Sequence, residues 1–482
     1  MAVPSTHRST HRRNIALAIS AVAFLWFEIA IVSPRAQTPS GSAPPGGGKA
    51  AGQVVAAKDP GPRGGDPGAG APIGGLADYE NSYFFSAQKE FDAPETVAEG
   101  LGPRMNLDSC VGCHTQPAAG GSSPAVNPQF AFASQNGGTD TAPPFITANG
   151  PVRETRYVRN ADGSPDGGVH AIFTINGRTG SSTDCTLQQP DYDTQLAANN
   201  VIFRIPTPTF GGGLIESIPD SAIIANAASN APTKTSLGIQ GRPNFQVSGR
   251  TISGQTNNNG NDGTVARFGW KAQNKSLLLF AGEAYNVEMG ITNELFQTER
   301  DETSACQYAT VPNDTTNMAA ATAFDGLSSI EKFAIFMRFL APPTPSTDTP
   351  GGATSIKNGS RLFNSVGCAL CHTPSMQTGN SAVAALRNQP VNLYSDLLTH
   401  DMGNGLADGV SQGQAGPRDF RTAPLWGLGQ RLFFLHDGRT ADLLAAIGAH
   451  LSDGSEANGV VNNFNQLNES QKQDLLNFLR SL

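Results

Sequence analysis

Two segments of the chain place hydrophobic residues at helical spacing behind the same kind of start signal. Residues 328–331 form a capping box, with Ser328 at the start and Glu331 three positions later. Asn468 and Gln471 repeat that arrangement close to the C-terminus. The apolar positions are Phe333, Phe336, Met337 and Leu340 in the first segment and Leu475, Leu476, Phe478, Leu479 and Leu482 in the second. The pattern predicts one amphipathic helix in each segment, and Pro342-Pro343 ends the first.

The region from about 120 to 265 has a different pattern. It is rich in Gly, Asn, Thr and Pro, and its apolar residues gather in short β-prone runs such as 171–175 and 201–205. These features predict a loop-rich insertion with some β-hairpins. The sequence does not indicate what the insertion contacts.

The longest apolar run lies near the N-terminus, from Ile15 to Val32, and Glu28 is its only charged residue. Arg and His residues precede it and Ala36 ends a cleavable Ser-Pro-Arg-Ala segment, so residues 1–36 are predicted to be a signal peptide. An uncleaved membrane anchor is the alternative, because the run approaches the length that spans a bilayer. Residues 37–74 are dominated by Gly, Pro and Ala and are expected to form a linker. Either way the body of the protein is expected to be exported, to the periplasm or an equivalent compartment.

Composition narrows the classes of partner. The chain has 482 residues, with 32 Lys and Arg against 40 Asp and Glu, for a formal charge of −8. This balance offers no basic stripe for phosphate groups, so a nucleic-acid partner is not expected. The high Gly and Pro content, 54 and 33 residues, predicts many ordered loops.

Four of the six cysteines fall in two Cys-x-x-Cys-His strings, the pattern that attaches c-type haem. The strings are Cys110-Val111-Gly112-Cys113-His114 and Cys368-Ala369-Leu370-Cys371-His372. On one helical turn both thiols face a porphyrin edge and the adjacent His reaches the iron. The alternatives are a dithiol enzyme and a zinc site in which all four cysteines share one metal. A dithiol needs no fifth-position His, however, and each pair here carries its own.

The two remaining thiols, Cys185 and Cys306, lie in polar stretches. An oxidising compartment favours a disulfide between them. Two unpaired thiols in surface loops are the alternative.

The order of these features predicts a mainly α protein with two cytochrome c-like haem domains. Each has a haem string near its start and an amphipathic helix at its end. The N-terminal domain is expected to span residues 75–342 and to contain the insertion at about 120–265. A Pro-rich linker at 343–353 leads to the C-terminal domain, residues 354–482.

Further segments resemble bacterial di-haem cytochrome c peroxidases and, more closely, the di-haem oxidoreductase family, whose members are sometimes labelled thiol oxidoreductases. The C-terminal half matches at residues 420–429 and 434–439, and the N-terminal half at 268–270 and 287–290. Residues 102–108 and 261–264 are similar to the oxidoreductase family in particular. The resemblance implies two packed cytochrome c folds whose haems reduce hydrogen peroxide or oxidise a partner protein. It leaves open whether calcium binds as well.

The resemblance also implies roles for single residues. Glu288 corresponds to the catalytic glutamate, and Trp270 to a tryptophan near the haems; a solvated carboxylate and an ordinary buried aromatic are the alternatives. Arg421 and Arg439 are expected to pair with haem propionates, or else with Asp419 and Asp437. The predicted haem-binding residues are Cys110, Cys113, His114, Cys368, Cys371, His372, Arg421 and Arg439, with His114, His372 and Met402 on iron.

The chain departs from the peroxidase pattern where iron ligands are concerned. Leu435 stands where the peroxidases commonly place a Met that ligates the second haem. Met402 is the candidate replacement, with His400 as its rival, and a thioether would raise the haem potential. Phe280 stands where a glutamine is expected, and no His occurs between His114 and His170. The first haem is therefore expected to be five-coordinate. His170 and His450 are interpreted as structural or surface histidines, and His436 as a residue that donates a hydrogen bond to a group in contact with the haem.

Together these features predict an exported di-haem c-type oxidoreductase. In this interpretation the C-terminal haem passes electrons from a small redox protein to an N-terminal haem that activates hydrogen peroxide or another oxidant. The alternative is an electron carrier with two six-coordinate haems and no substrate of its own. A dithiol oxidoreductase would instead require four titratable thiols and no haem absorbance.

Overall fold

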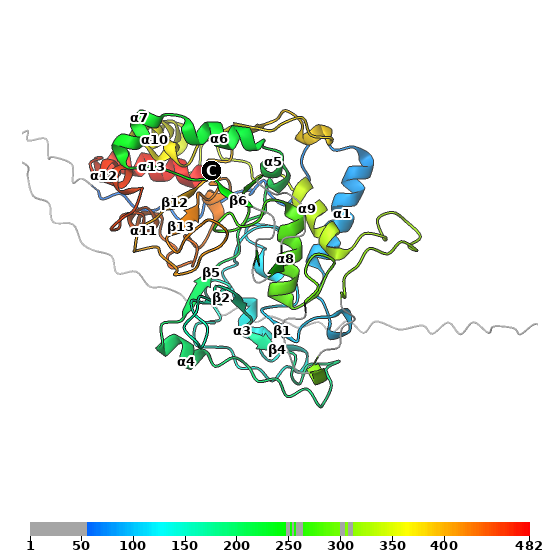
Figure 1. The fold of residues 1–482 in the computed structure, drawn as a ribbon. Coiled ribbons are helices and arrows are strands. Elements are labelled where there is room, and N and C mark those ends of the chain that lie inside the picture. The colour runs from blue at the N-terminus through cyan, green and yellow to red at the C-terminus, as the bar shows by residue number, and fades with distance from the viewer. Residues whose placement is uncertain (1–54, 247–250, 253–254, 257–263, 299–303, 307–311) are drawn as a thin grey trace, which may run out of the picture. The chain divides into compact units, whose positions relative to one another are not determined.

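The computed structural model describes residues 55–246, 251–252, 255–256, 264–298, 304–306 and 312–482 (Figure 1). The predicted signal peptide, residues 1–36, and the linker up to residue 54 lie outside the described residues. From Val54 to Leu482 the chain forms one unit by its internal contacts, so the division at 343–353 stays a prediction. Within the described part, no helix is both long enough and apolar enough to cross a bilayer.

Three helices form the core beside the first haem string: α1 (Asp78–Asp92), α8 (Leu277–Met289) and α9 (Ser329–Phe339). α9 begins at the predicted capping box, where the Glu331 carboxylate accepts a hydrogen bond from the Ser328 backbone N–H at 2.9 Å. Its apolar face packs on α1, with the rings of Phe91 and Phe336 4.6 Å apart. α2 (Cys110–Cys113) carries the first string beside α1.

Helices α10 (Gly352–Val366) and α13 (Glu469–Ser481) form a second hydrophobic core. α13 begins where the sequence predicts, with the Asn468 side chain accepting from the Gln471 N–H at 2.9 Å. α10 ends at Gly367, whose φ of 105° lies in the left-handed region that glycine adopts without strain. That reversal leads directly into the second haem string.

Gly359 allows α10 and α13 to approach closely, because a Cβ there would overlap the Asp474 carbonyl oxygen and the Phe478 side chain. We expect Gly359→Ala to lower the free energy of unfolding by about 1–3 kcal/mol through overpacking. The measurement is the urea midpoint of the holoprotein. Gly448→Ala is the matched control, since a Cβ at this helical glycine meets open space and should add up to about 1 kcal/mol. Equal midpoints for the two variants would contradict the close crossing.

The insertion contains small sheets and more helix than predicted. β2 (Glu154–Tyr157) pairs antiparallel with β3 (Val169–His170) and β5 (Val201–Arg204), and β1 (Arg104–Met105) pairs with β4 (Phe173–Thr174). Its helices are α3 (Pro128–Phe132), α4 (Tyr192–Ala197), α5 (Gly212–Glu216), α6 (Asp220–Ala228) and α7 (Ala231–Leu237). They are short and rich in small residues, so they give no clear apolar periodicity. The prediction of loops with hairpins alone was therefore incomplete.

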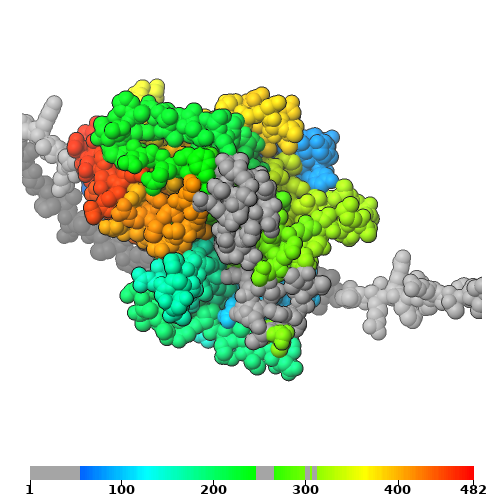
Figure 2. Space-filling model, in the orientation of Figure 1, coloured from blue at the N-terminus to red at the C-terminus, as the bar shows by residue number. Residues whose placement is uncertain are grey.

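The insertion packs on the C-terminal half. On the face seen in Figure 2, the green surface of α6 and α7 lies against the red surface of the C-terminal helices. The Asn226 amide donates to the Thr373 hydroxyl at 2.9 Å, one residue beyond the second haem string. A disulfide joins Cys185 and Cys306, which confirms the favoured pairing.

The remaining elements complete a helix-rich fold with small sheets, in agreement with the mainly α class, while two cytochrome c folds stay a prediction. The strands and α-helices not yet named are β6 (Asn244–Gln246), β7 (Thr251–Ile252), β8 (Gln255–Thr256), β9 (Thr264–Ala266), β10 (Met376–Gln377), β11 (Pro390–Val391), β12 (Thr399–Asp401), β13 (Asp419–Arg421), α11 (Leu443–Ala449) and α12 (Asn458–Asn465).

Part of the predicted linker is held against the body of the protein. Asp59 forms a buried ion pair with Arg480 of α13, at 2.7 Å between Oδ2 and Nη2. The composition of residues 37–74 gave no sign of this order, because the stabilising partner lies 421 residues away in sequence.

Candidate haem sites

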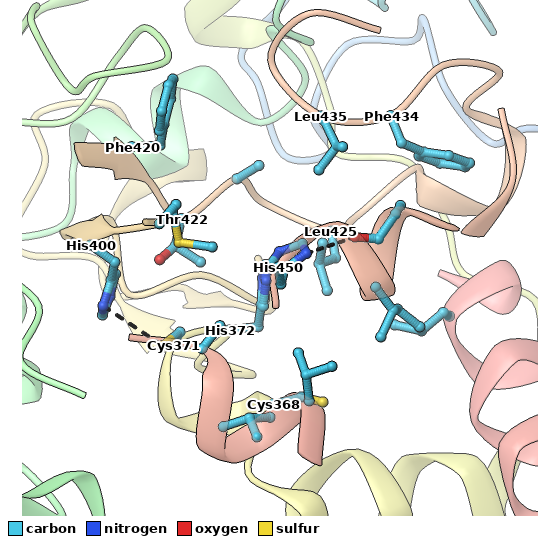
Figure 3. A pocket seen from close by; sticks show the side chains of 18 of the residues that line it. Cys368, Cys371, His372, His400, Phe420, Thr422, Leu425, Phe434, Leu435 and His450 are labelled. Carbon is cyan, nitrogen blue, oxygen red and sulfur yellow. Dashed lines mark hydrogen bonds between the residues drawn. The ribbon is translucent and has the colours of Figure 1, made fainter. Parts of the chain in front are cut away.

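The second Cys-x-x-Cys-His string lines a largely apolar cavity, named here the C-terminal cavity (Figure 3). Cys368, Cys371 and His372 enter it from the end of α10. His372 Nδ1 lies 3.1 Å from the Tyr394 carbonyl oxygen, which leaves Nε2 as its other ring nitrogen. The apolar walls include Phe363, Leu425, Phe434, Leu435, Leu443 and Phe464.

The first string lines a separate N-terminal cavity. His114 Nδ1 lies 2.9 Å from the Gly121 carbonyl oxygen, so this ring is oriented like that of His372. Burial lowers the pKa of both histidines to about 4. Both imidazoles are therefore neutral at pH 7, the form that binds a metal. Because the two cysteine pairs line different cavities, they do not form one zinc site with four cysteine ligands.

Buried arginines without carboxylate partners support the fit to haem, whose propionates carry negative charge. Arg421 and Arg431 line the C-terminal cavity, and burial lowers the pKa of each to about 10, which still leaves them cationic. Neither makes an ion pair within the described residues. Arg153 lines the N-terminal cavity, and its buried Nε has no hydrogen-bond partner among the residues that the structure describes. Guanidinium groups of this kind match carboxylates in geometry and charge.

Arg439, predicted to hold a propionate, lines neither cavity. Its guanidinium pairs with Asp437 at 2.7 Å and donates to the Gly405 carbonyl oxygen at 2.8 Å. The structure thus places Arg439 in the alternative arrangement, whereas Arg431 takes a position that the sequence did not point to. Each is a single Arg in a loop, and the sequence around it gives no pattern that indicates which of the two lines a cavity.

Trp270 is the residue that the two cavities share. Its indole N–H donates to the Ile205 carbonyl oxygen at 2.8 Å, which fixes the ring in place. The His436 ring stands nearly perpendicular to it at 6.4 Å and stacks on Phe420 at 4.3 Å. An aromatic series therefore runs from the wall between the cavities along the C-terminal cavity.

Glu288 lies in the last turn of α8 and faces the N-terminal cavity. Its Oε2 accepts a hydrogen bond from the Asn106 side chain at 2.6 Å. Burial, followed by the like charge of Glu154, raises the pKa of Glu288 to about 8. Glu288 therefore carries a proton in its main form at pH 7, and the Glu154 carboxyl group lines the same cavity.

Sequence reasoning missed Glu154 and its neighbour Arg156, both of which line the same cavity. They lie on the short strand β2, and the buried Arg156 guanidinium pairs with the Glu154 carboxylate. Arg156 also donates to the Gly167 carbonyl oxygen at 2.8 Å, which orients it. Alternating charges on a four-residue strand resemble an ordinary solvated edge, so no signal distinguished these residues. Phe280, where a glutamine was expected, lines the cavity as an apolar wall.

The predicted iron ligands of the C-terminal cavity have different surroundings. Met402 lines it and packs beside the cluster of Ile205, Trp270 and Phe420. His400, its rival, has both ring nitrogens engaged, with Glu456 at 2.8 Å and Asp396 at 3.0 Å. No lone pair of the His400 ring is thus available to iron. His400 also lies near Cys371 and Asp396, but this cluster does not offer the oxygen ligands that calcium prefers.

Two histidines were interpreted as structural or surface residues. For His170 the structure agrees, since its Nε2 pairs with Asp166 at 2.8 Å and its ring stacks on Tyr157 at 3.6 Å. His450 is half-buried and lines the C-terminal cavity, a position that the apolar periodicity of its helix did not indicate.

Comparisons with known proteins agree with these cavities at the level of the family. A family model described as "Di-haem oxidoreductase, putative peroxidase" matches residues 153–482, which is more than half of the chain. No curated protein matches. Among solved structures, Kuenenia stuttgartiensis hydrazine synthase pressurized with 20 bar xenon is 18% identical, covers 33% of this chain and 58% of its own, and gives a TM-score of 0.22. The match thus spans less than two thirds of that protein's length, and at this score it supports no argument about the chain.

Proposed function

The chain belongs to the di-haem oxidoreductase family, and on that premise we propose that it is a di-haem c-type enzyme that reduces hydrogen peroxide or a similar small oxidant. Electrons enter at the C-terminal haem and pass to the N-terminal haem, where the oxidant reacts. The protein works outside the cytoplasm, in the periplasm or its equivalent, and takes electrons from a small redox protein.

One observation carries this proposal: the two cavities share Trp270, but the carboxyl pair of Glu154 and Glu288 lines the N-terminal cavity alone. The C-terminal cavity contains no comparable pair of carboxyl groups facing each other among its lining residues. Electron transfer needs only proximity, whereas cleavage of an O–O bond also needs a proton donor. This asymmetry supports a reaction on the N-terminal side.

The cavity residues divide the work of that reaction. Haem, when bound, supplies an iron that accepts the oxidant and exchanges electrons with it. Glu288 holds the proton that is delivered to the departing oxygen, while the Glu154 carboxyl group accepts a proton from the other oxygen. Arg156 holds Glu154 in place, and Asn106 does the same for Glu288. Reduction of hydrogen peroxide to two waters consumes two electrons and two protons, and the redox partner supplies the electrons.

A second candidate function is electron transfer without substrate chemistry. Met289 and Met337 line the N-terminal cavity, and a thioether from either would close the iron to an oxidant. In that case both haems would be six-coordinate.

The test is stopped-flow absorbance of half-reduced holoprotein mixed with hydrogen peroxide. We expect one haem to be high-spin and to react with hydrogen peroxide on the stopped-flow time scale, while the second haem is oxidised. Two low-spin haems that remain inert to peroxide would contradict the proposal and leave the electron carrier.

A further inference from the structure

His450 occupies a position in the C-terminal cavity that neither the family match nor the sequence assigns. It follows directly after α11, which is capped by the Asp442 side chain accepting from the Ala445 N–H at 2.8 Å. The first residue of that helix, Leu443, is held by Asp59 through its N–H at 2.7 Å. The end of α11 is thus fixed on the cavity wall, and Figure 3 shows the His450 side chain inside the cavity with His372.

The ring of His450 is oriented as a metal ligand would be. Its Nδ1 lies 2.8 Å from the Ala446 carbonyl oxygen, one helical turn earlier. A ring N–H bound to a backbone carbonyl fixes the tautomer and leaves the lone pair on Nε2. His372 has the same arrangement with the Tyr394 carbonyl oxygen. Both imidazoles line the C-terminal cavity, as Figure 3 shows.

The other nitrogen and sulfur donors of this cavity have different surroundings. Both nitrogens of His400 bind carboxylates. The His436 ring stacks on Phe420 and stands against Trp270. Met402 packs beside that same aromatic cluster. Besides His372, the imidazoles of this cavity without a carboxylate hydrogen bond among the described residues are those of His436 and His450. Of these two, only the His450 ring is held by a hydrogen bond to a backbone carbonyl oxygen in that part of the chain.

We propose that His450 Nε2 is the sixth ligand of the C-terminal haem iron, with His372 as the fifth. This inference rests on haem binding at the second Cys-x-x-Cys-His string and does not require peroxide chemistry. Two imidazole ligands make the iron low-spin and closed to oxidants, so this haem serves as an electron carrier. They also give it a lower potential than a His and Met pair would, since a thioether raises it. The predicted Met402 ligand is then a packing residue.

The experiment compares His450→Ala, His450→Met and Met402→Leu in holoprotein, using optical and EPR spectra recorded without peroxide. We expect His450→Ala to convert one of the two haems from low-spin to high-spin and added imidazole to restore the low-spin signal. His450→Met should keep that haem low-spin, introduce the weak red absorption band of a thioether ligand and raise its potential. Met402→Leu should leave the spectra unchanged.

The opposite pattern would overturn the inference. If Met402→Leu produces the high-spin haem and His450→Ala does not, Met402 is the ligand. If neither variant changes the spin state, the ligand is another group and His450 is structural. Haem content per chain is measured for each variant, and imidazole rescue separates a lost ligand from a misfolded cavity. A spin change in His450→Ala together with a wild type inert to peroxide would support this ligand while rejecting the proposed function.

Discussion

Replacing Glu288 with Gln is expected to slow the reaction of half-reduced holoprotein with hydrogen peroxide by about 10²–10⁴-fold. Gln has nearly the same shape and can still accept the hydrogen bond from Asn106, but it neither takes up nor releases a proton. The haem spectrum and haem content should stay as in the wild type. The measurement is the second-order rate constant of the first spectral change after mixing.

The pH dependence of the same rate constant identifies the proton involved. Because the pKa of Glu288 is raised to about 8, this residue keeps its proton below that pH and loses it above. The wild-type rate is therefore expected to be level near neutrality and to fall as the pH rises through about 8. Glu288→Gln should lack this fall. The sign follows from the role of Glu288 as the proton donor to the departing oxygen.

Glu283→Gln is the matched control for Glu288→Gln. Glu283 is a buried carboxyl on the same helix, hydrogen-bonded to Asn274, and it does not line the N-terminal cavity. Its variant should react within about twofold of the wild type. If Glu288→Gln reacted as fast as Glu283→Gln, the carboxyl pair would have no part in peroxide cleavage.

The haem strings and the two capped helices could be predicted because their signals are local in sequence. A capping box and a run of apolar positions lie within one segment, and the structure begins α9 and α13 at the expected residues. Cys-x-x-Cys-His is likewise complete within five positions. Features of this kind need no knowledge of the tertiary structure.

The partners of these strings could not be predicted, because tertiary packing brings them together. Glu154 reaches Glu288 across 134 positions of sequence, and His450 lies 78 positions beyond His372. Neither has a neighbouring residue that distinguishes it from a surface group. The insertion illustrates the same limit, since Arg204, Ile205 and Thr207 line the N-terminal cavity although their segment predicted only a β-prone run.

The largest expected effect on stability comes from Asp408→Asn, which we expect to lower the free energy of unfolding by about 3–5 kcal/mol. Asp408 Oδ2 lies 2.8 Å from Arg204 Nη2, and its Oδ1 lies 3.1 Å from Lys271 Nζ. All three side chains are at most 2% exposed. Loss of the carboxylate charge leaves two cations buried without a counter-charge. The network also supports Trp270, since Lys271 follows it directly and lies 4.0 Å over the Phe420 ring.

Acid should weaken the wild-type network in the same way. Burial raises the pKa of Asp408, but attraction to Arg204 and Lys271 outweighs it and leaves the pKa below its ordinary value. The carboxylate therefore stabilises the fold above the unfolded-state pKa, and this contribution is lost as the pH falls through the folded-state value. The difference in urea midpoint between wild type and Asp408→Asn should be full at pH 7 and shrink in acid. Asp437→Asn breaks a partly exposed pair with Arg439 and should cost less than about 1 kcal/mol. If Asp408→Asn lowered the free energy of unfolding no more than Asp437→Asn, groups other than Asp408 would have to compensate the buried charges of Arg204 and Lys271. The cavity wall around Trp270 would then not depend on Asp408.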